Sequence, residues 1–123
     1  MIYTGYYARL NEYIEQGLTP IAISGAVPNF YDTDTHLWWK FLAPSYDIFS
    51  KWKSGELNDF GYVSRYIPER LDILDKQDLK QKLLSVENPI LLCYEKEGFC
   101  HRHVLADWIE MNLGLIVEEY KGF

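Results

Sequence analysis

The sequence predicts a single α/β domain, residues 1–123, built on a small, mainly parallel sheet with flanking helices. Two observations carry this prediction: a strand–helix–strand pattern occurs near each end of the chain, and the stretch between the two patterns is helical. A length of 123 residues is that of one domain. Internal repeats and low-complexity linkers are absent from the sequence.

The C-terminal unit has the clearest signals. Residues Pro89–Tyr94 form a continuous apolar run that begins with proline, which is typical of a strand buried on both faces. Apolar residues then recur at helical spacing from about Cys100 to Asn112, and Gly114 suits the left-handed position after a helix end. Leu115–Val117 reads as a short strand. We therefore expect a right-handed parallel crossover.

The N-terminal unit is less distinct. Ile2–Thr4 and Pro20–Ser24 are apolar enough for strands, and Asn11 is a suitable N-cap for a short helix that ends near Gly17. The following segment, Asn29–Ala43, is rich in aromatic residues but has no sustained period. We interpret it as a long loop, and loops of that length are often functional.

The central stretch from Ser45 to Ser85 is predicted to hold three helices. Ser45, Asp59 and Asp75 are suitable N-caps for them, and Pro68 is expected to end the second. The prediction is therefore a helical insert between strands two and three.

Composition narrows the class of protein. Apolar residues make up 48% and charged residues 24%, as in a globular domain. A net charge of −6 argues against broad nucleic-acid binding and against an anionic membrane surface as partners. The sequence has neither a membrane-spanning apolar run nor a signal-peptide layout at its start. With only two cysteines we expect no disulfide scaffold, and a reduced, cytoplasmic setting.

The segment Cys100–His103, with the sequence Cys-His-Arg-His, is the strongest candidate for a functional site. It opens a helix directly after a buried strand, at the sheet edge where ligands of open α/β sheets bind. The usual capping side chains are absent there, and Arg102 with two imidazoles stands at the positive end of the helix dipole. Free backbone N–H groups and a guanidinium together predict an anion site.

A purely structural interpretation remains open. Glu95 and Glu97 precede the helix and are candidates to pair with Arg102 or His103, and Asp107 lies one helical turn after His103. In that case the segment is a self-neutralised turn and binds no ligand.

The same segment contains residues suited to two further kinds of chemistry, nucleophilic catalysis and metal binding. A thiol at a helix N-terminus has a lowered pKa, so Cys100 is a candidate nucleophile and His101 a candidate acid–base group, although Cys100 also fits as a packed thiol. Cys93, Cys100, His101 and His103 are potential metal ligands. Because Cys93 belongs to a strand expected to be buried and no Cys-x-x-Cys pair occurs, we predict no metal and no other cofactor.

Other residues are predicted to reach the same edge of the sheet. Gly5 allows close backbone approach, and Ser24 ends the second predicted strand. Aromatic residues reach 16% of the chain, and half-exposed aromatic rings are suited to stacking on a base. The aromatic residues expected to contact a ligand are Tyr6, Tyr7, Tyr31 and Trp38.

The motif residues resemble a known family. The runs Leu92–Lys96, Phe99–His103 and Ala106–Trp108 resemble the family of domain of unknown function 488, in the short form found in bacteria and their phages. Weaker matches are Ile2–Thr4 with Tyr6, Ile21–Ser24, Pro28 with Tyr31, and Leu42–Pro44. The resemblance implies a small α/β fold with the Cys-His-Arg segment at a functional edge, and it implies no particular reaction.

Our leading functional hypothesis is the binding of a phosphate-bearing, nucleotide-like small molecule at the Cys-His-Arg-His helix start. Arg102 and the backbone at the Cys100 helix start would hold the phosphate, and His101 and His103 would add hydrogen bonds. A phage-encoded protein of this kind would sequester a host nucleotide signal. The first alternative is a thiol- or histidine-dependent enzyme that acts on a phosphoester or glycosidic bond of a nucleotide. The second is a protein–protein interaction module, with an exposed apolar patch as its mark.

Overall fold

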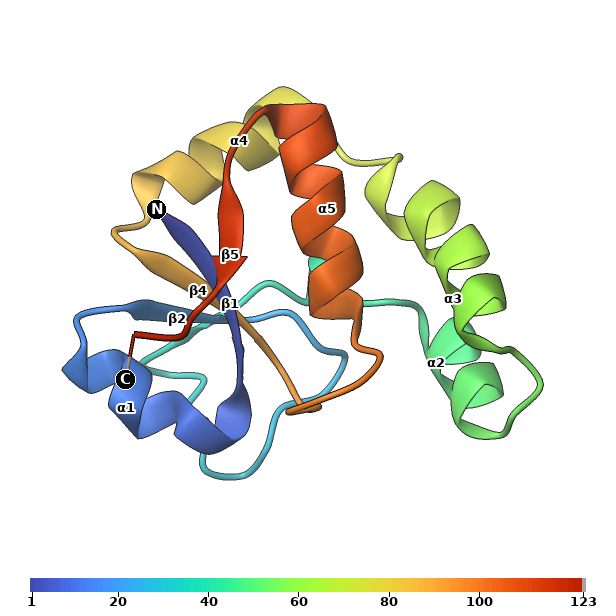
Figure 1. Ribbon diagram of the computed structural model, residues 1–123, viewed down its shortest axis with the longest axis horizontal. Helices are drawn as coiled ribbons and strands as arrows, with labels where there is room; N and C mark the ends of the chain where they lie inside the picture. Colours follow the sequence, from blue (N-terminus) through green and yellow to red (C-terminus); the bar gives the residue numbers. More distant parts are fainter. Residues whose placement is uncertain (123) are drawn as a thin grey trace.

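The computed structural model describes residues 1–122 and shows a mixed α/β fold on one five-stranded sheet (Figure 1). All strands are parallel, in the order β3-β2-β4-β1-β5. The elements are, in chain order, β1 (Ile2–Tyr6), the 3-10 helix η1 (Tyr7–Arg9), α1 (Leu10–Glu15), β2 (Thr19–Ala22), β3 (Leu37–Trp38), the 3-10 helix η2 (Lys40–Leu42), α2 (Tyr46–Lys53), α3 (Asp59–Tyr66), the π-helical η3 (Ile67–Leu71), α4 (Lys76–Ser85), β4 (Pro89–Cys93), α5 (His101–Leu113) and β5 (Val117–Glu119).

The central strand is β4, and all five of its residues are buried, as the continuous apolar run predicts. Its last residue, Cys93, is in register with Tyr6 at the end of β1, and Leu92 is in register with Ala22 at the end of β2. The carboxyl ends of three neighbouring strands therefore meet at one edge of the sheet.

Side chains of β4 alternate between two cores, as the pleat of a strand requires. Leu91 and Cys93 belong to the core under α3, α4 and α5, whereas Ile90 and Leu92 belong to the core under α1. Figure 1 shows α1 on one side of the sheet and α5, with the α2–α3 pair beyond it, on the other. Cys93 thus points toward the side that carries the helical insert.

The predicted loop Asn29–Ala43 is wrong in part, because it contains β3 and η2. The backbone N–H of Trp39 donates to Ala22 O at 2.8 Å, and the Tyr31 hydroxyl accepts from Ala22 N and donates to Leu37 O, so this segment is bound along β2. A two-residue strand is too short to leave a periodic signal. The helical insert consequently lies between the third and fourth strands, not between strands two and three.

Helix ends agree with the sequence at some positions and differ at others. Ser45 and Asp75 cap α2 and α4 as predicted, and Gly114 has a φ of +69° after α5. The cap of α3 is Asn58, whose side chain accepts from Gly61 N, and not Asp59. α3 ends at Tyr66, just before Pro68 as predicted, and the chain continues as η3, with Pro68 near its start, where no N–H is needed.

The C-terminal strand also differs from its prediction. β5 covers Val117–Glu119 rather than Leu115–Val117, and it runs parallel to β4 in the same sheet with β1 between them. This shift brings Glu119 into the sheet. No helix among residues 1–122 is long and apolar enough to cross a membrane.

Candidate functional site

A cavity of about 520 Å³ lies at the carboxyl ends of β2 and β4. Its lining comes from the residues that follow these two strands, from the start of α5, and from α2 and α3. Six aromatic residues line it: Tyr46, Phe49, Trp52, Tyr62, Tyr94 and Phe99. The cavity is therefore at the sheet edge where ligands of open α/β sheets bind, and we call its six aromatic residues the aromatic wall.

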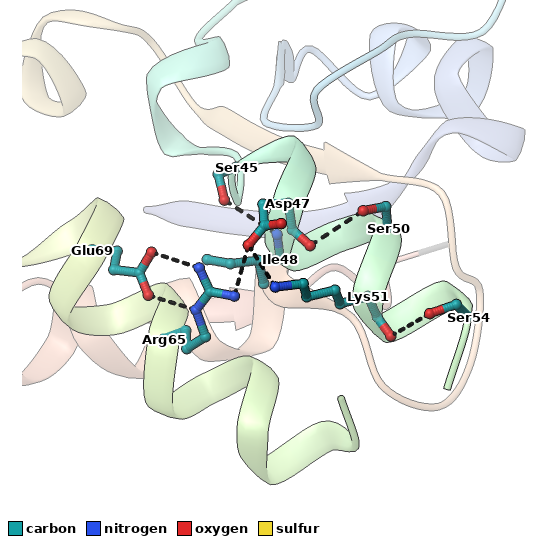
Figure 2. Close-up of polar contacts among 8 residues, drawn as sticks. All are labelled: Ser45, Asp47, Ile48, Ser50, Lys51, Ser54, Arg65 and Glu69. Carbon is teal, nitrogen blue, oxygen red and sulfur yellow. Dashed lines mark hydrogen bonds and ion pairs between the residues drawn. The ribbon is translucent and has the colours of Figure 1, made fainter. Parts of the chain in front are cut away.

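The α2–α3 hairpin supplies one wall and is held by charges between its helices (Figure 2). Arg65 of α3 pairs with Asp47 of α2 at 2.9 Å and with Glu69 of η3 at 2.7 Å. Lys51 adds a second cation near Asp47, at 3.4 Å. These contacts raise the pKa of Arg65 and lower the pKa of both carboxyl groups, because each charged form is stabilised by its partners.

His101 is buried beside the cavity and is held by one strong hydrogen bond. Its Nε2 lies 2.7 Å from Ile23 O, and since a carbonyl only accepts, Nε2 carries the proton and Nδ1 keeps a lone pair. Burial lowers the pKa of His101 to about 4, against the opposing effect of the bond to Ile23. The imidazole is neutral at pH 7, so it is able to accept a proton or a hydrogen bond at Nδ1.

The two cysteines meet next to His101. Cys93 and Cys100 are joined as a disulfide, although the count of two cysteines had led us to expect reduced thiols. Cys100 is the N-cap residue of α5, and Cys93 lines the cavity because the side chain at the end of β4 points toward the α5 side. The expectation that burial in the strand removes Cys93 from the site was therefore wrong.

Arg102 points away from the cavity and into the sheet. Its Nε and Nη2 donate to the Glu119 carboxylate at 3.0 and 2.9 Å. The remaining N–H groups donate to Cys93 Sγ at 3.2 Å and to the carbonyl oxygens of Glu95 and Lys96. A guanidinium has five N–H groups, and here each has a partner inside the protein.

The structure therefore revises the role expected of Arg102, which offers no spare donor to a ligand. The structural interpretation was correct in kind but not in the partner, because the pairing carboxylate is Glu119 of β5 rather than Glu95 or Glu97. Partial burial opposes ionisation of Glu119, but the hydrogen bonds from Arg102 and Thr4 lower its pKa. His103 is exposed on α5 and does not line the cavity.

Three tyrosines behind β2, which we call the tyrosine cluster (Tyr7, Tyr13 and Tyr31), are core residues at most 3% exposed. The Tyr7 hydroxyl lies 2.5 Å from Ser24 Oγ, and Tyr13 Oη accepts from Tyr6 N at 3.2 Å. Burial raises the pKa of Tyr31 to about 12. Tyr7 and Tyr31, predicted as stacking residues, are thus packed against the protein itself.

Of the remaining predicted site residues, some line the cavity and others contact only the protein itself. Ser24 lines the cavity, with its hydroxyl donating to Ala26 O at 2.6 Å. Tyr6 lies over the Arg102 guanidinium at 5.8 Å, and Trp38 donates to Ser24 O. A Cβ at Gly5 would lie 2.6 Å from Tyr13 Oη, so the close approach at this glycine is made by a core side chain. Of the ten predicted residues, Ser24, Cys100 and His101 line the cavity.

The cavity also contains residues that the sequence analysis did not select. Lys40 and Lys53 are its lysines, and Lys53 Nζ lies 5.5 Å from the Trp52 ring. Trp52 lies on α2, and its Nε1 donates to Asp59 at 2.8 Å. The available signal was the aromatic content of α2 itself, since three of its eight residues are aromatic.

Residues 11–113 match the family described as DUF488-N3a, the active DUF488-N3 subclade. The chain belongs to the DUF488-N3a family. The matched segment includes the α2–α3 hairpin, β4 and the Cys-His-Arg-His start of α5, so every cavity residue named above lies within the DUF488-N3a match. β1 and β5, and with them Glu119, lie outside it. Comparisons with curated proteins and with solved structures gave no significant match.

Proposed function

We propose that the protein binds a phosphate-bearing, nucleotide-like small molecule in the cavity at the carboxyl ends of β2 and β4. The observation that carries the proposal is the cavity itself. Its volume of about 520 Å³ is in the range of small-molecule sites, which are mostly apolar with a few placed polar groups. An open aromatic wall with cations beside it suits a ring joined to a phosphate.

The ring of such a ligand has partners on α2. Phe49 is 41% exposed and Tyr46 is 82% exposed, so each has ring surface to offer. Trp52, Tyr62 and Phe99 pack on one another at centroid distances of 4.8–5.7 Å and form a firm base behind them. Stacking of a base on an aromatic side chain contributes about 1–3 kcal/mol to binding.

The phosphate has partners in Lys40 and Lys53, the lysines that line the cavity. Lysine binds phosphate as a point charge, and the positive end of the α5 dipole lies on the same side. His101 adds an acceptor at Nδ1 for a hydroxyl or amino group of the ligand. In this arrangement lysines replace Arg102 as the phosphate-binding cations.

Titration calorimetry with reduced protein tests the proposal, using nucleosides, nucleoside mono-, di- and triphosphates and inorganic phosphate as ligands. We expect Lys53→Ala to weaken binding of the best nucleotide about 10-fold, because a hydrogen bond to a charged group contributes about 1.5–3 kcal/mol. Lys51→Ala is the matched control on the same helix, because Lys51 lies outside the cavity. Equal losses in both variants, or no binding by any ligand at millimolar concentration, would reject the proposal.

A second pair of variants tests the stacking wall. Phe49→Ala is expected to lower the affinity about 5-fold or more through loss of ring contact. Phe60→Ala is its control, because Phe60 is 80% exposed on α3 and is not part of the lining. A nucleoside that binds both variants equally well contradicts a role for this wall.

An enzyme is the second candidate, and a specific observation favours it: Cys100 and a neutral His101 line the same cavity. His101 Nδ1 is placed to act as a general base, and the reduced Cys100 thiol is a candidate nucleophile. The description of the family as an active subclade supports a search for turnover. Product analysis on the same panel distinguishes the candidates: binding without products indicates sequestration, and products lost in Cys100→Ser and His101→Gln indicate catalysis.

A further inference from the structure

We propose that in the reduced protein Cys93, Cys100 and His101 bind a zinc-class metal ion whose fourth coordination position opens into the cavity. The ligand atoms of these three buried residues all lie within 4.8 Å of one another. Zn–S bonds of about 2.3 Å and Zn–N bonds of about 2.0 Å place tetrahedral ligand atoms roughly 3.5–3.8 Å apart. Once the disulfide is reduced and the two sulfur atoms separate, side-chain rotations are enough to place the three ligand atoms around one ion.

The backbone spacing of the two cysteines suits an ion between them. Their Cα atoms are 7.3 Å apart, whereas bridged cysteines usually have Cα atoms about 4.4–6.8 Å apart. Cys93 is held by the β4 ladder and Cys100 by the start of α5, so both ends of the pair stand on regular elements. Two thiolates at these positions are therefore able to bind one ion between them.

The surrounding hydrogen bonds are those that metal ligands need. The Nε2–H of His101 donates to Ile23 O at 2.7 Å, which fixes the ring and leaves Nδ1 as the ligand nitrogen. A metal-binding histidine usually donates its other N–H to a carbonyl or carboxylate in this way. Arg102 Nη1 donates to Cys93 Sγ at 3.2 Å, and an N–H donor of this kind stabilises a thiolate.

The charges also balance. A divalent ion with two thiolates and a neutral imidazole carries no net charge, and Arg102 is already neutralised by Glu119 at 2.9 Å. Burial of the site therefore leaves no unpaired charge away from water. Sites with three protein ligands keep the fourth position for water or a substrate group, and here that position faces the cavity. The site does not depend on the nucleotide proposal, because it is defined without any organic ligand.

Metal titration of reduced, metal-free protein tests this inference without a nucleotide. We expect one Zn²⁺ per chain in competition with a chromogenic chelator. Co²⁺ in its place should give the sulfur-to-metal charge-transfer band and the intense visible bands of a tetrahedral thiolate site. Zn²⁺ should also protect both cysteines from alkylation by iodoacetamide. The air-oxidised protein is the first control, because disulfide sulfurs are not thiolates and should not bind the ion.

The variants assign the ligands. Cys93→Ser, Cys100→Ser and His101→Ala should each weaken Zn²⁺ binding by at least about 100-fold, more than the loss of an outer hydrogen-bond partner. His103→Ala is the matched control from the same helical turn and should bind as the wild type. Far-ultraviolet circular dichroism identifies variants that fail to fold. If a variant does not fold, the Co²⁺ spectrum of the wild-type protein still tests thiolate ligation. Co²⁺ bound without the thiolate band, or equal binding by His101→Ala and His103→Ala, would overturn the site.

Discussion

The tyrosine cluster and the aromatic wall of the cavity are built from the same residue types but differ in where their polar atoms point. In the cluster, the Tyr31 hydroxyl accepts from Ala22 N and donates to Leu37 O, so its bonding is complete within the protein. Tyr62 is equally buried at 2%, yet it lines the cavity, and its hydroxyl has no hydrogen bond to any residue in the part of the chain that the structure describes. The first group maintains the fold, whereas the second lines the cavity in which we propose that a ligand binds.

Arg102 and Lys53 differ in the same way as Tyr31 and Tyr62. Arg102 is 1% exposed with every donor used, whereas Lys53 stands at the cavity over an aromatic ring. A strongly hydrogen-bonding side chain next to a helix N-terminus is therefore not by itself a sign of ligand binding. What separates Arg102 and Tyr31 from Lys53 and Tyr62 is the satisfaction of their polar atoms by the protein itself.

The largest expected effect is on the free energy of unfolding and comes from removing the ion pair between Arg102 and Glu119. Glu119→Gln leaves the buried Arg102 charge unpaired, and removal of one partner of a buried ion pair costs about 3–5 kcal/mol. We expect the free energy of unfolding, measured by urea denaturation, to fall by this amount. Glu118→Gln in the same strand is the control, since Glu118 is exposed and surface changes stay within about 0.5 kcal/mol. Equal stabilities of the two variants would mean that the pair is not a structural element.

The next effect concerns His101 and pH. Its folded-state pKa of about 4 lies below the ordinary value of 6.5, so the unfolded chain binds the additional proton first as the pH falls. The stability contributed by neutral His101 is therefore present above pH 6.5 and is lost progressively between about pH 6.5 and pH 4. The loss is about 3 kcal/mol at 1.36 kcal/mol for each pKa unit.

His101→Gln isolates this contribution, because glutamine keeps a donor for Ile23 O and does not titrate. The difference in unfolding free energy between wild type and variant should shrink as the pH falls from 7 to 4. A constant difference across that range contradicts a buried neutral histidine.

The smallest effect compares the two tyrosines directly. Tyr31→Phe leaves the buried Ala22 N–H without its partner and should cost about 1–3 kcal/mol of unfolding free energy. Tyr62→Phe removes a hydroxyl that makes no such bond and should change stability by less than about 0.5 kcal/mol. Its effect should be seen instead in nucleotide affinity. A larger loss of unfolding free energy in Tyr62→Phe than in Tyr31→Phe would contradict the distinction between the tyrosine cluster and the aromatic wall.

The sequence predicted secondary structure correctly where a hydrophobic pattern extends over several consecutive residues or a capping residue marks a helix start. The five buried residues of β4, the helix after it and the caps Ser45 and Asp75 all follow from periodicity and capping chemistry. It failed for β3, which has two residues and is held by backbone bonds to β2. Cys100 and His101 line the cavity, whereas Tyr7 and Tyr31 belong to the core, and nothing local in the sequence distinguishes a core tyrosine from a tyrosine of the cavity wall.

By itself, the amino-acid sequence determined that this is an α/β chain of the DUF488 type with its Cys-His-Arg-His segment at the carboxyl edge of a sheet. Only the tertiary structure decided which side chains of that segment face the cavity and which face the sheet. Helical geometry turns consecutive side chains about 100° apart, so His101 faces the cavity while Arg102 faces β5. The carboxylate that neutralises Arg102 comes from 17 residues later in the chain, and the aromatic wall comes from about 50 residues earlier. Such contacts depend on how the strands and helices pack, and local patterns do not record them.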